Sequence, residues 1–86
     1  QAVEWKIQVP GVVQRHEPLI IQMMEEWDEP LRFRWIDIHG RVCESLEKRI
    51  QQGETNVLLE RPVHPGIYLL QLESQGELKN YKVIVL

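Results

Sequence analysis

The sequence has a single cysteine and no long apolar run, and each shortage excludes a class of protein. Cys43 has no partner, so the chain cannot form an internal disulfide, and a lone cysteine in a strand is typically a small buried residue. The longest purely apolar run has four residues, whereas a transmembrane helix needs about 20. No signal peptide is recognisable at Gln1, so we expect the chain to be a fragment of a longer protein.

Positive charge does not predominate either, because the sequence has 10 lysines and arginines against 13 aspartates and glutamates. The net charge is −3 and the isoelectric point is near 5.6. The basic pairs Arg32 with Arg34 and Lys48 with Arg49 have acidic neighbours and form no extended stripe. Because nucleic-acid binding depends on a basic surface that neutralises phosphates, the composition argues against a nucleic-acid partner.

The residues needed for metal binding or catalysis are few and far apart. His16, His39 and His64 are more than twenty residues apart, whereas zinc ligands usually come in closely spaced pairs. The only serines, Ser45 and Ser74, lie in no recognisable nucleophile motif. We therefore expect no metal, no cofactor and no catalytic residue, and a protein that is not an enzyme.

The sequence does contain a repeated alternation of apolar and polar residues. Val3, Trp5, Ile7 and Val9 alternate with polar residues, which is typical of a strand with one buried face. We expect strands at residues 3–9, 19–24, 31–38, 42–50, 56–59, 67–72 and 78–86, with residues 12–13 as a continuation of the first. With turn signals roughly every 8–12 residues, the pattern predicts one all-β domain over residues 1–86, an Ig-like sandwich of about seven antiparallel strands in two sheets.

Several local signals refine this prediction. All five prolines fall at the ends of expected strands, where a missing N–H is tolerated. The apolar phase slips after Trp35, which predicts either a bulge near Trp35-Ile36 or partial cover of both faces. Gly40 suits a tight turn that needs a positive φ. Residues 42–50 could also form a helical turn, but the turn before them favours a strand that pairs back.

Three segments carry a family resemblance when they are taken in order. Residues 36–42 read hydrophobic-Asp-x-x-Gly-Arg-Val, and residues 53–57 are followed by Pro-Gly-Ile-Tyr-Leu-Leu at residues 65–70. Residues 81–85, Tyr-Lys-Val-Ile-Val, form an apolar segment with one lysine near the end of the chain. Together these segments resemble the hairpin, the Gly-x-Tyr segment and the closing strand of the C-terminal sorting domain of the type IX secretion system.

The resemblance implies a C-terminal signal that folds as an Ig-like sandwich in the periplasm. An outer-membrane translocon recognises such domains, and a sortase-like peptidase usually removes them. The cargo then reaches the outer membrane or cell surface of a Gram-negative bacterium, often attached to anionic lipopolysaccharide. Some components of the machinery retain the domain for docking or lipopolysaccharide binding. Both versions stay open, because Val9-Pro10-Gly11 replaces the usual Pro-Asn-Pro opening and Leu86 replaces the common terminal basic residue.

The candidate recognition residues belong to those segments, and each also has a structural interpretation. They are Asp37, Gly40, Arg41, Gly66, Tyr68 and Lys82. Asp37 and Arg41 could pair across the hairpin. Tyr68 could be a buried anchor whose hydroxyl bonds to the nearby backbone. Lys82 could mark a solvent-facing position or guard a sheet edge.

Trp27 is a further candidate, because it lies inside an acidic run. It could fold over the edge of the core, or it could serve as a glycan or interface contact. In the second case the domain could bind lipopolysaccharide, with Trp27 stacked on a sugar and with phosphates held by basic residues. Those residues would be Arg15, Arg32, Arg34 or Lys48. A third alternative is a structural accessory domain beside a larger one.

Overall fold

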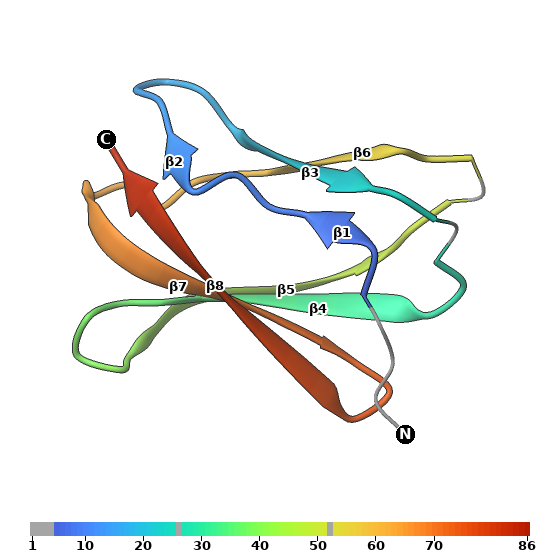
Figure 1. Cartoon of the computed structure of the whole chain (residues 1–86). Coiled ribbons are helices and arrows are strands. Elements are labelled where there is room, and N and C mark those ends of the chain that lie inside the picture. Colours follow the sequence, from blue (N-terminus) through green and yellow to red (C-terminus); the bar gives the residue numbers. More distant parts are fainter. Residues whose placement is uncertain (1–4, 26, 52) are drawn as a thin grey trace.

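The computed structural model describes residues 5–25, 27–51 and 53–86, and this part of the chain contains eight strands and no helix (Figure 1). The prediction of an all-β fold in two sheets is therefore confirmed. Val3 and Glu4 of the first expected strand lie outside the described residues. The same holds for Glu26 of the acidic run around Trp27 and for Gln52, which follows the expected strand at residues 42–50.

The smaller sheet has three antiparallel strands in the order β1-β3-β6. Its strands are β1 (Ile7–Gln8), β3 (Leu19–Met23) and β6 (Asn56–Leu59). Every second side chain of β3 and β6 is buried and the others are exposed. This sheet therefore turns one apolar face to the interior, as alternating sequences dictate.

The larger sheet has five strands in the order β2-β8-β7-β4-β5. Its strands are β2 (Val12–Val13), β8 (Glu77–Val85), β7 (Gly66–Ser74), β4 (Pro30–Ile36) and β5 (Val42–Arg49). All neighbours pair antiparallel except β2 and β8, which are parallel. In Figure 1, β2 lies beside the end of β8, near the C-terminus.

The structure has one strand more than the expected seven. Residues 12–13 do not continue the first strand, because β1 pairs with β3 in the smaller sheet and β2 pairs with β8 in the larger one. Pro10 and Gly11 lie between them, and the chain changes sheets there. A proline has no N–H to continue a ladder, which explains the break.

The core lies between the two sheets and draws on both. Its largest fully buried side chains are Trp35 and Phe33 of β4. Trp35 meets the ring of Tyr68 edge-on, with 6.1 Å between the ring centroids. In β4, β7 and β8, buried residues alternate with residues that point outward, and the buried residues of adjacent strands pair with one another. The outward residues of these strands therefore share the other face of the larger sheet.

The β4–β5 hairpin of the larger sheet bears out two local expectations. The register between β4 and β5 shifts between Trp35 and Ile36, so the expected bulge is present. Residues 42–49 form a strand, not a helical turn. The hairpin between β7 and β8 turns through Gln75 and Gly76, both with positive φ, which matches the twist of the flanking strands.

Candidate functional site

The hairpin between β4 and β5 is organised by one carboxylate. Asp37 Oδ1 accepts the backbone N–H groups of His39 at 2.9 Å and Arg41 at 3.0 Å. Asp37 Oδ2 accepts the Arg41 Nε–H at 3.1 Å. Gly40 has a φ of 81°, a conformation that glycine adopts at no steric cost. Asp37 and Arg41 therefore do pair, and the turn presents the exposed Arg41 side chain in a fixed frame.

These bonds also set the charge of the turn. The N–H of Arg41 is the main cause that lowers the pKa of the Asp37 carboxyl below its ordinary value of 3.8, and the His39 N–H and the Arg41 guanidinium add to it. Hydrogen bonds and an opposite charge both favour the ionised form of a carboxyl group. Asp37 is therefore a firmly ionised part of the hairpin at neutral pH.

Tyr68 is a buried anchor at the start of β7. Its side chain is 8% exposed, and its hydroxyl donates to the backbone carbonyl of His64 at 2.7 Å. Burial raises the pKa of the Tyr68 hydroxyl. Gly66 lies two residues before it, and a Cβ there would lie 3.7 Å from the Tyr68 ring. Tyr68 holds the segment before β7 against the core, so a partner would meet the neighbouring outward residues first.

The three segments of the family resemblance meet on one face. Leu69 of β7 pairs directly with Ile36 of β4 on one side and with Lys82 of β8 on the other. Directly paired residues of antiparallel strands point to the same side of the sheet. Ile36, Leu69 and Lys82 therefore form one row on the outer face of the larger sheet.

This row continues into an apolar surface. Ile67 pairs with Ile84, and Ile84 pairs with Val12 of β2, in the next outward row. Val12, Ile67 and Leu69 are each more than two-fifths exposed. Contiguous exposed aliphatic side chains on a soluble domain often mark an interaction site. We call the two rows, residues 12, 36, 67, 69, 82 and 84, the outer-face patch.

Sequence reasoning missed Ile36, Leu69 and their pairing with Lys82. A signal was present, because residues 67–70 are apolar at the outward positions 67 and 69 as well as at the inward positions. A strand with one solvated face should instead alternate with polar residues. The contact between the three segments itself depends on strand pairing, which an isolated sequence does not specify.

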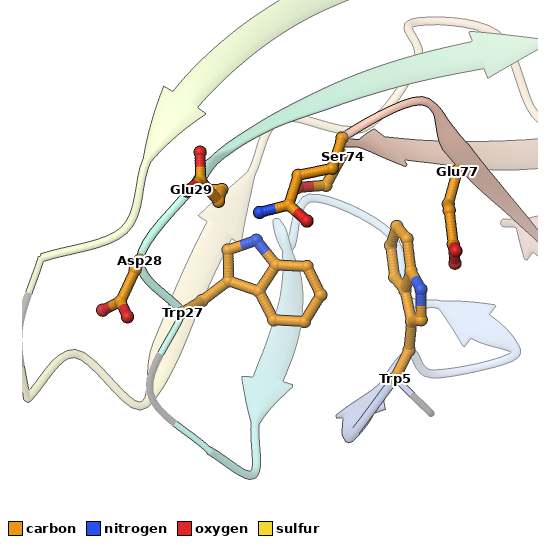
Figure 2. Close-up of a pocket in the computed structure, with 7 residues that line it drawn as sticks. Trp5, Trp27, Asp28, Glu29, Ser74 and Glu77 are labelled. Atoms are coloured by element: carbon orange, nitrogen blue, oxygen red, sulfur yellow. The ribbon is translucent and has the colours of Figure 1, made fainter. Parts of the chain in front are cut away.

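Trp27 is half-buried and folds over the edge of the core, where it packs against Trp5 with 5.1 Å between ring centroids. The two indoles line a pocket of about 230 Å³ with Ser74 and Glu77 of the β7–β8 hairpin (Figure 2). Its remaining lining residues are Asp28, Glu29 and Gln75. The pocket therefore combines aromatic surface with carboxylates and offers no cationic lining.

Two polar atoms at this pocket are buried without a partner in the described part of the chain, Trp27 Nε1 and Ser74 Oγ. Ser74 is 6% exposed, so its hydroxyl is largely cut off from bulk water. A buried polar group without a hydrogen bond lowers stability. Since the three surrounding side-chain carboxylates repel anions, the chemistry of this pocket does not suit a phosphate-bearing sugar.

Three of the basic residues proposed for phosphate binding instead pair with carboxylates. Arg32 lies 3.2 Å from Glu47, Arg34 lies 2.8 Å from Glu73, and Lys48 lies 3.7 Å from Glu54. Arg15 lies in an exposed turn between β2 and β3. The structure therefore does not bring these residues together with Trp27 as a phosphate-binding cluster.

The expectation that Cys43 is buried is wrong. Cys43 is exposed on β5, and its Sγ lies 3.8 Å from the carbonyl oxygen of Arg41. Cys43 is exposed because β5 is the edge strand of the larger sheet and pairs only with β4. No residue from 42 to 49 is fully buried. A cysteine is buried only where another layer covers its strand.

The remaining candidate residues do not assemble into a reactive centre in the described part of the chain. His16, His39 and His64 all lie in turns or loops. Among the described residues, no three histidine, cysteine, aspartate or glutamate side chains gather closely enough to hold a metal ion. No helix long and apolar enough to cross a membrane occurs in residues 5–25, 27–51 and 53–86.

Comparison with known proteins assigns the chain to no family. No protein-family model, curated protein or solved structure matches the chain. The outer-face patch, the Asp37 hairpin and the Trp5–Trp27 pocket are therefore the features from which a function has to be argued.

Proposed function

We propose that this domain is a non-catalytic recognition module, read by the outer-membrane translocon of the type IX system as a sorting or docking signal. The observation that carries the proposal is the outer-face patch. Ile36, Leu69 and Lys82 come from three segments that are distant in sequence, yet they lie in one row on adjacent strands. Each segment is one that resembles the sorting domain, and their convergence on one face is what a recognition surface requires.

The strand arrangement supports an Ig-like topology for the sandwich. The first part of the chain contributes β1 to one sheet and β2 to the other. The Tyr68 hydroxyl bonds to the carbonyl of His64, four residues upstream, at the entry to β7. A tyrosine in this position near the start of a late strand is a recurring feature of Ig-like domains.

The proposed mechanism is display of a rigid surface without chemistry. Aliphatic side chains of the outer-face patch would be buried against the translocon, where they would form the fully buried, more apolar centre of the interface. Lys82 is exposed beside them and would orient the partner through its charge. The domain would act in the periplasm and then at the cell surface, with the sortase-like protein as a second partner.

Lipopolysaccharide binding is the weaker candidate. It would require Trp27 beside free cations, whereas Trp27 lines an acidic pocket and three of the basic residues are paired with glutamates. A purely structural accessory role predicts that the outer-face patch covers a neighbouring domain of the parent protein. The sorting role predicts that the domain directs export of a fused reporter, whereas neither alternative predicts export.

The test is export of a reporter fused to residues 1–86 in a host with a type IX system. The informative variant is Leu69→Glu, in the middle of the outer-face patch. The matched control is Leu58→Glu, because Leu58 is an exposed leucine in a strand on the outer side of the smaller sheet. We expect Leu69→Glu to reduce export by at least about tenfold, as for a central interface residue, and Leu58→Glu to leave it unchanged.

Equal export of the two variants would reject the outer-face patch as the recognised surface. Failure of the unsubstituted fusion to leave the cell would reject the sorting role itself. Retention of that fusion on immobilised lipopolysaccharide would then favour the lipopolysaccharide alternative. Mass spectrometry of the mature parent protein distinguishes a removed signal, which is absent, from a retained docking domain, which is present.

A further inference from the structure

The first part of β8 has a strand neighbour on only one side. β7 pairs with β8 from Glu77 to Val85, whereas β2 pairs only with Ile84 and Val85. The chain arrives from the other sheet through Pro10 and Gly11, and it therefore reaches β8 only near the end of that strand. Among the described residues, no strand lies along the other side of β8 from residue 77 to residue 83.

Two hydrogen bonds show which backbone groups face this free edge. The N–H of Ile84 donates to the carbonyl of Gly11 at 2.8 Å, and the N–H of Leu86 donates to the carbonyl of Val13 at 3.0 Å. In an antiparallel strand, the N–H and C=O of one residue lie on the same side, and successive residues alternate. The N–H and C=O groups of residues 78, 80 and 82 therefore point away from β7 and have no backbone partner in the described part of the chain.

A mainly apolar groove reaches this edge at Tyr81. It has a volume of about 450 Å³, and its lining residues are Ile7, Gln8, Val9, Pro10, Ile20, Gln22 and Tyr81. Tyr81 packs against the core, so it lies on the inner side of β8. A strand laid along the free edge would direct every second side chain to that inner side. Its other side chains would lie on the outer side with the exposed Lys82.

We propose that the edge of β8 from Leu78 to Lys82 accepts an extended segment of a partner protein as an additional strand. The segment needs about five residues, which matches the length of the free edge at one residue per 3.4 Å or so. It would carry apolar residues toward the groove and an acidic residue opposite Lys82. Backbone hydrogen bonds supply the affinity in this mode of recognition, and the side chains supply specificity.

A second copy of the domain fits this edge poorly. Symmetric antiparallel pairing of two β8 strands about Asn80 would place Tyr81 of one copy opposite Lys79 of the other, on the inner side. Lys79 would then have its charge beside the apolar groove, and burial of an unpaired charge is unfavourable. The occupant is therefore a different chain. This inference depends only on the free backbone groups and the groove, so it does not require the secretion role.

The first test is amide hydrogen exchange of the whole 86-residue chain, with a synthetic peptide as the probe. The peptide has nine residues of alternating valine and threonine, with a glutamate at each end. In the free domain we expect the amides of residues 78, 80 and 82 to exchange at least about a hundredfold faster than those of Tyr81 and Val83. The peptide should slow the first group at least about tenfold and leave the second group unchanged.

A matched pair of variants tests whether the backbone or the side chain is recognised. Asn80→Pro removes the N–H at the centre of the free edge, whereas Asn80→Ala keeps it. Both variants lose the bond that the Gln71 side chain donates to Asn80 Oδ1. We expect peptide affinity to fall at least about tenfold in Asn80→Pro and to change less than about threefold in Asn80→Ala. Circular dichroism of each variant checks that it is folded.

A control peptide keeps the test decisive if Asn80→Pro does not fold. Methylation of every second peptide nitrogen removes the donors on one side of the added strand, so this peptide should not protect residues 78, 80 and 82. Equal protection by the methylated peptide would overturn the proposal. Slow exchange of these three amides in the dilute free domain would also overturn it. Protection that appears without peptide and grows with protein concentration would assign the edge to a second copy and overturn it as well.

Discussion

At the scale of single residues, the Tyr68 hydroxyl is the clearest case of a polar group that serves structure. We predict that Tyr68→Phe lowers the free energy of unfolding by about 1 kcal/mol, because it removes the 2.7 Å hydrogen bond to His64 and keeps the ring in the core. Denaturation in urea measures the change. The control is Tyr81→Phe, since the Tyr81 hydroxyl has no hydrogen-bond partner among the described residues. Equal losses in both variants would contradict the anchoring role of Tyr68.

Ser74 presents the opposite situation, a buried hydroxyl with no partner in the described part of the chain. We predict that Ser74→Ala leaves the free energy of unfolding unchanged or raises it by up to about 1 kcal/mol, because an unpaired hydroxyl no longer has to be buried. Thermal unfolding measures this. The chain offers Ser45→Ala as the control, since Ser45 is exposed on β5. A clear loss in Ser74→Ala alone would mean that the hydroxyl is hydrogen-bonded in solution, for instance to a buried water.

At the scale of elements, the β4–β5 hairpin depends on an ionised Asp37. Its pKa is lower in the folded protein than in the unfolded chain, because the Arg41 and His39 N–H groups stabilise the carboxylate. A lowered folded-state pKa contributes stability above the unfolded value, and that contribution is lost as the pH falls through the folded value. The hairpin should therefore lose this stabilisation in acid, as the pH falls through the lowered folded-state pKa of Asp37.

The corresponding prediction concerns Asp37→Asn. Its loss of unfolding free energy relative to the unsubstituted domain should be largest at neutral pH and should shrink as the pH falls below the ordinary carboxyl value of 3.8. Urea denaturation at neutral pH and at successively lower pH measures the difference. Glu60→Gln, at an exposed position outside the hairpin, is the control. A difference that does not depend on pH would show that the charge of Asp37 is not what stabilises the turn.

At the scale of the whole molecule, the final strand belongs to the core. Val83 and Val85 are 0% and 1% exposed, and β8 lies between β2 and β7. Burial of a valine side chain contributes roughly 1.5–3 kcal/mol, and a small domain has a total stability of about 5–15 kcal/mol. We predict that deletion of residues 82–86 unfolds the domain, whereas Leu86→Ala does not, since Leu86 is 46% exposed. Circular dichroism and amide chemical-shift dispersion measure both outcomes.

This prediction affects how secretion experiments are designed. Loss of export after deletion of residues 82–86 would follow from unfolding as well as from loss of a recognition site. Substitutions on the outer-face patch avoid that ambiguity, because Leu69 and Lys82 are exposed. A folded deletion variant would contradict the central place of β8 in the sheet.

The sequence by itself determined the class of fold and most of the strands. Alternation at residues 31–35 marked the inner face of β4, and the phase slip after Trp35 located the bulge. Gly40 marked a turn that needs a positive φ. These features are local, since the period of a strand and the conformation of a turn depend on neighbouring residues only.

The tertiary structure alone decided which strands meet and which surfaces stay open. It placed Ile36, Leu69 and Lys82 in one row, moved residues 12–13 to the larger sheet and left Cys43 exposed on an edge strand. It also left the edge of β8 without a full partner. Pairing and cover depend on contacts between distant segments, which are selected by how the two sheets pack together. For that reason the candidate recognition residues could be named from the sequence, but the surface that they share could not.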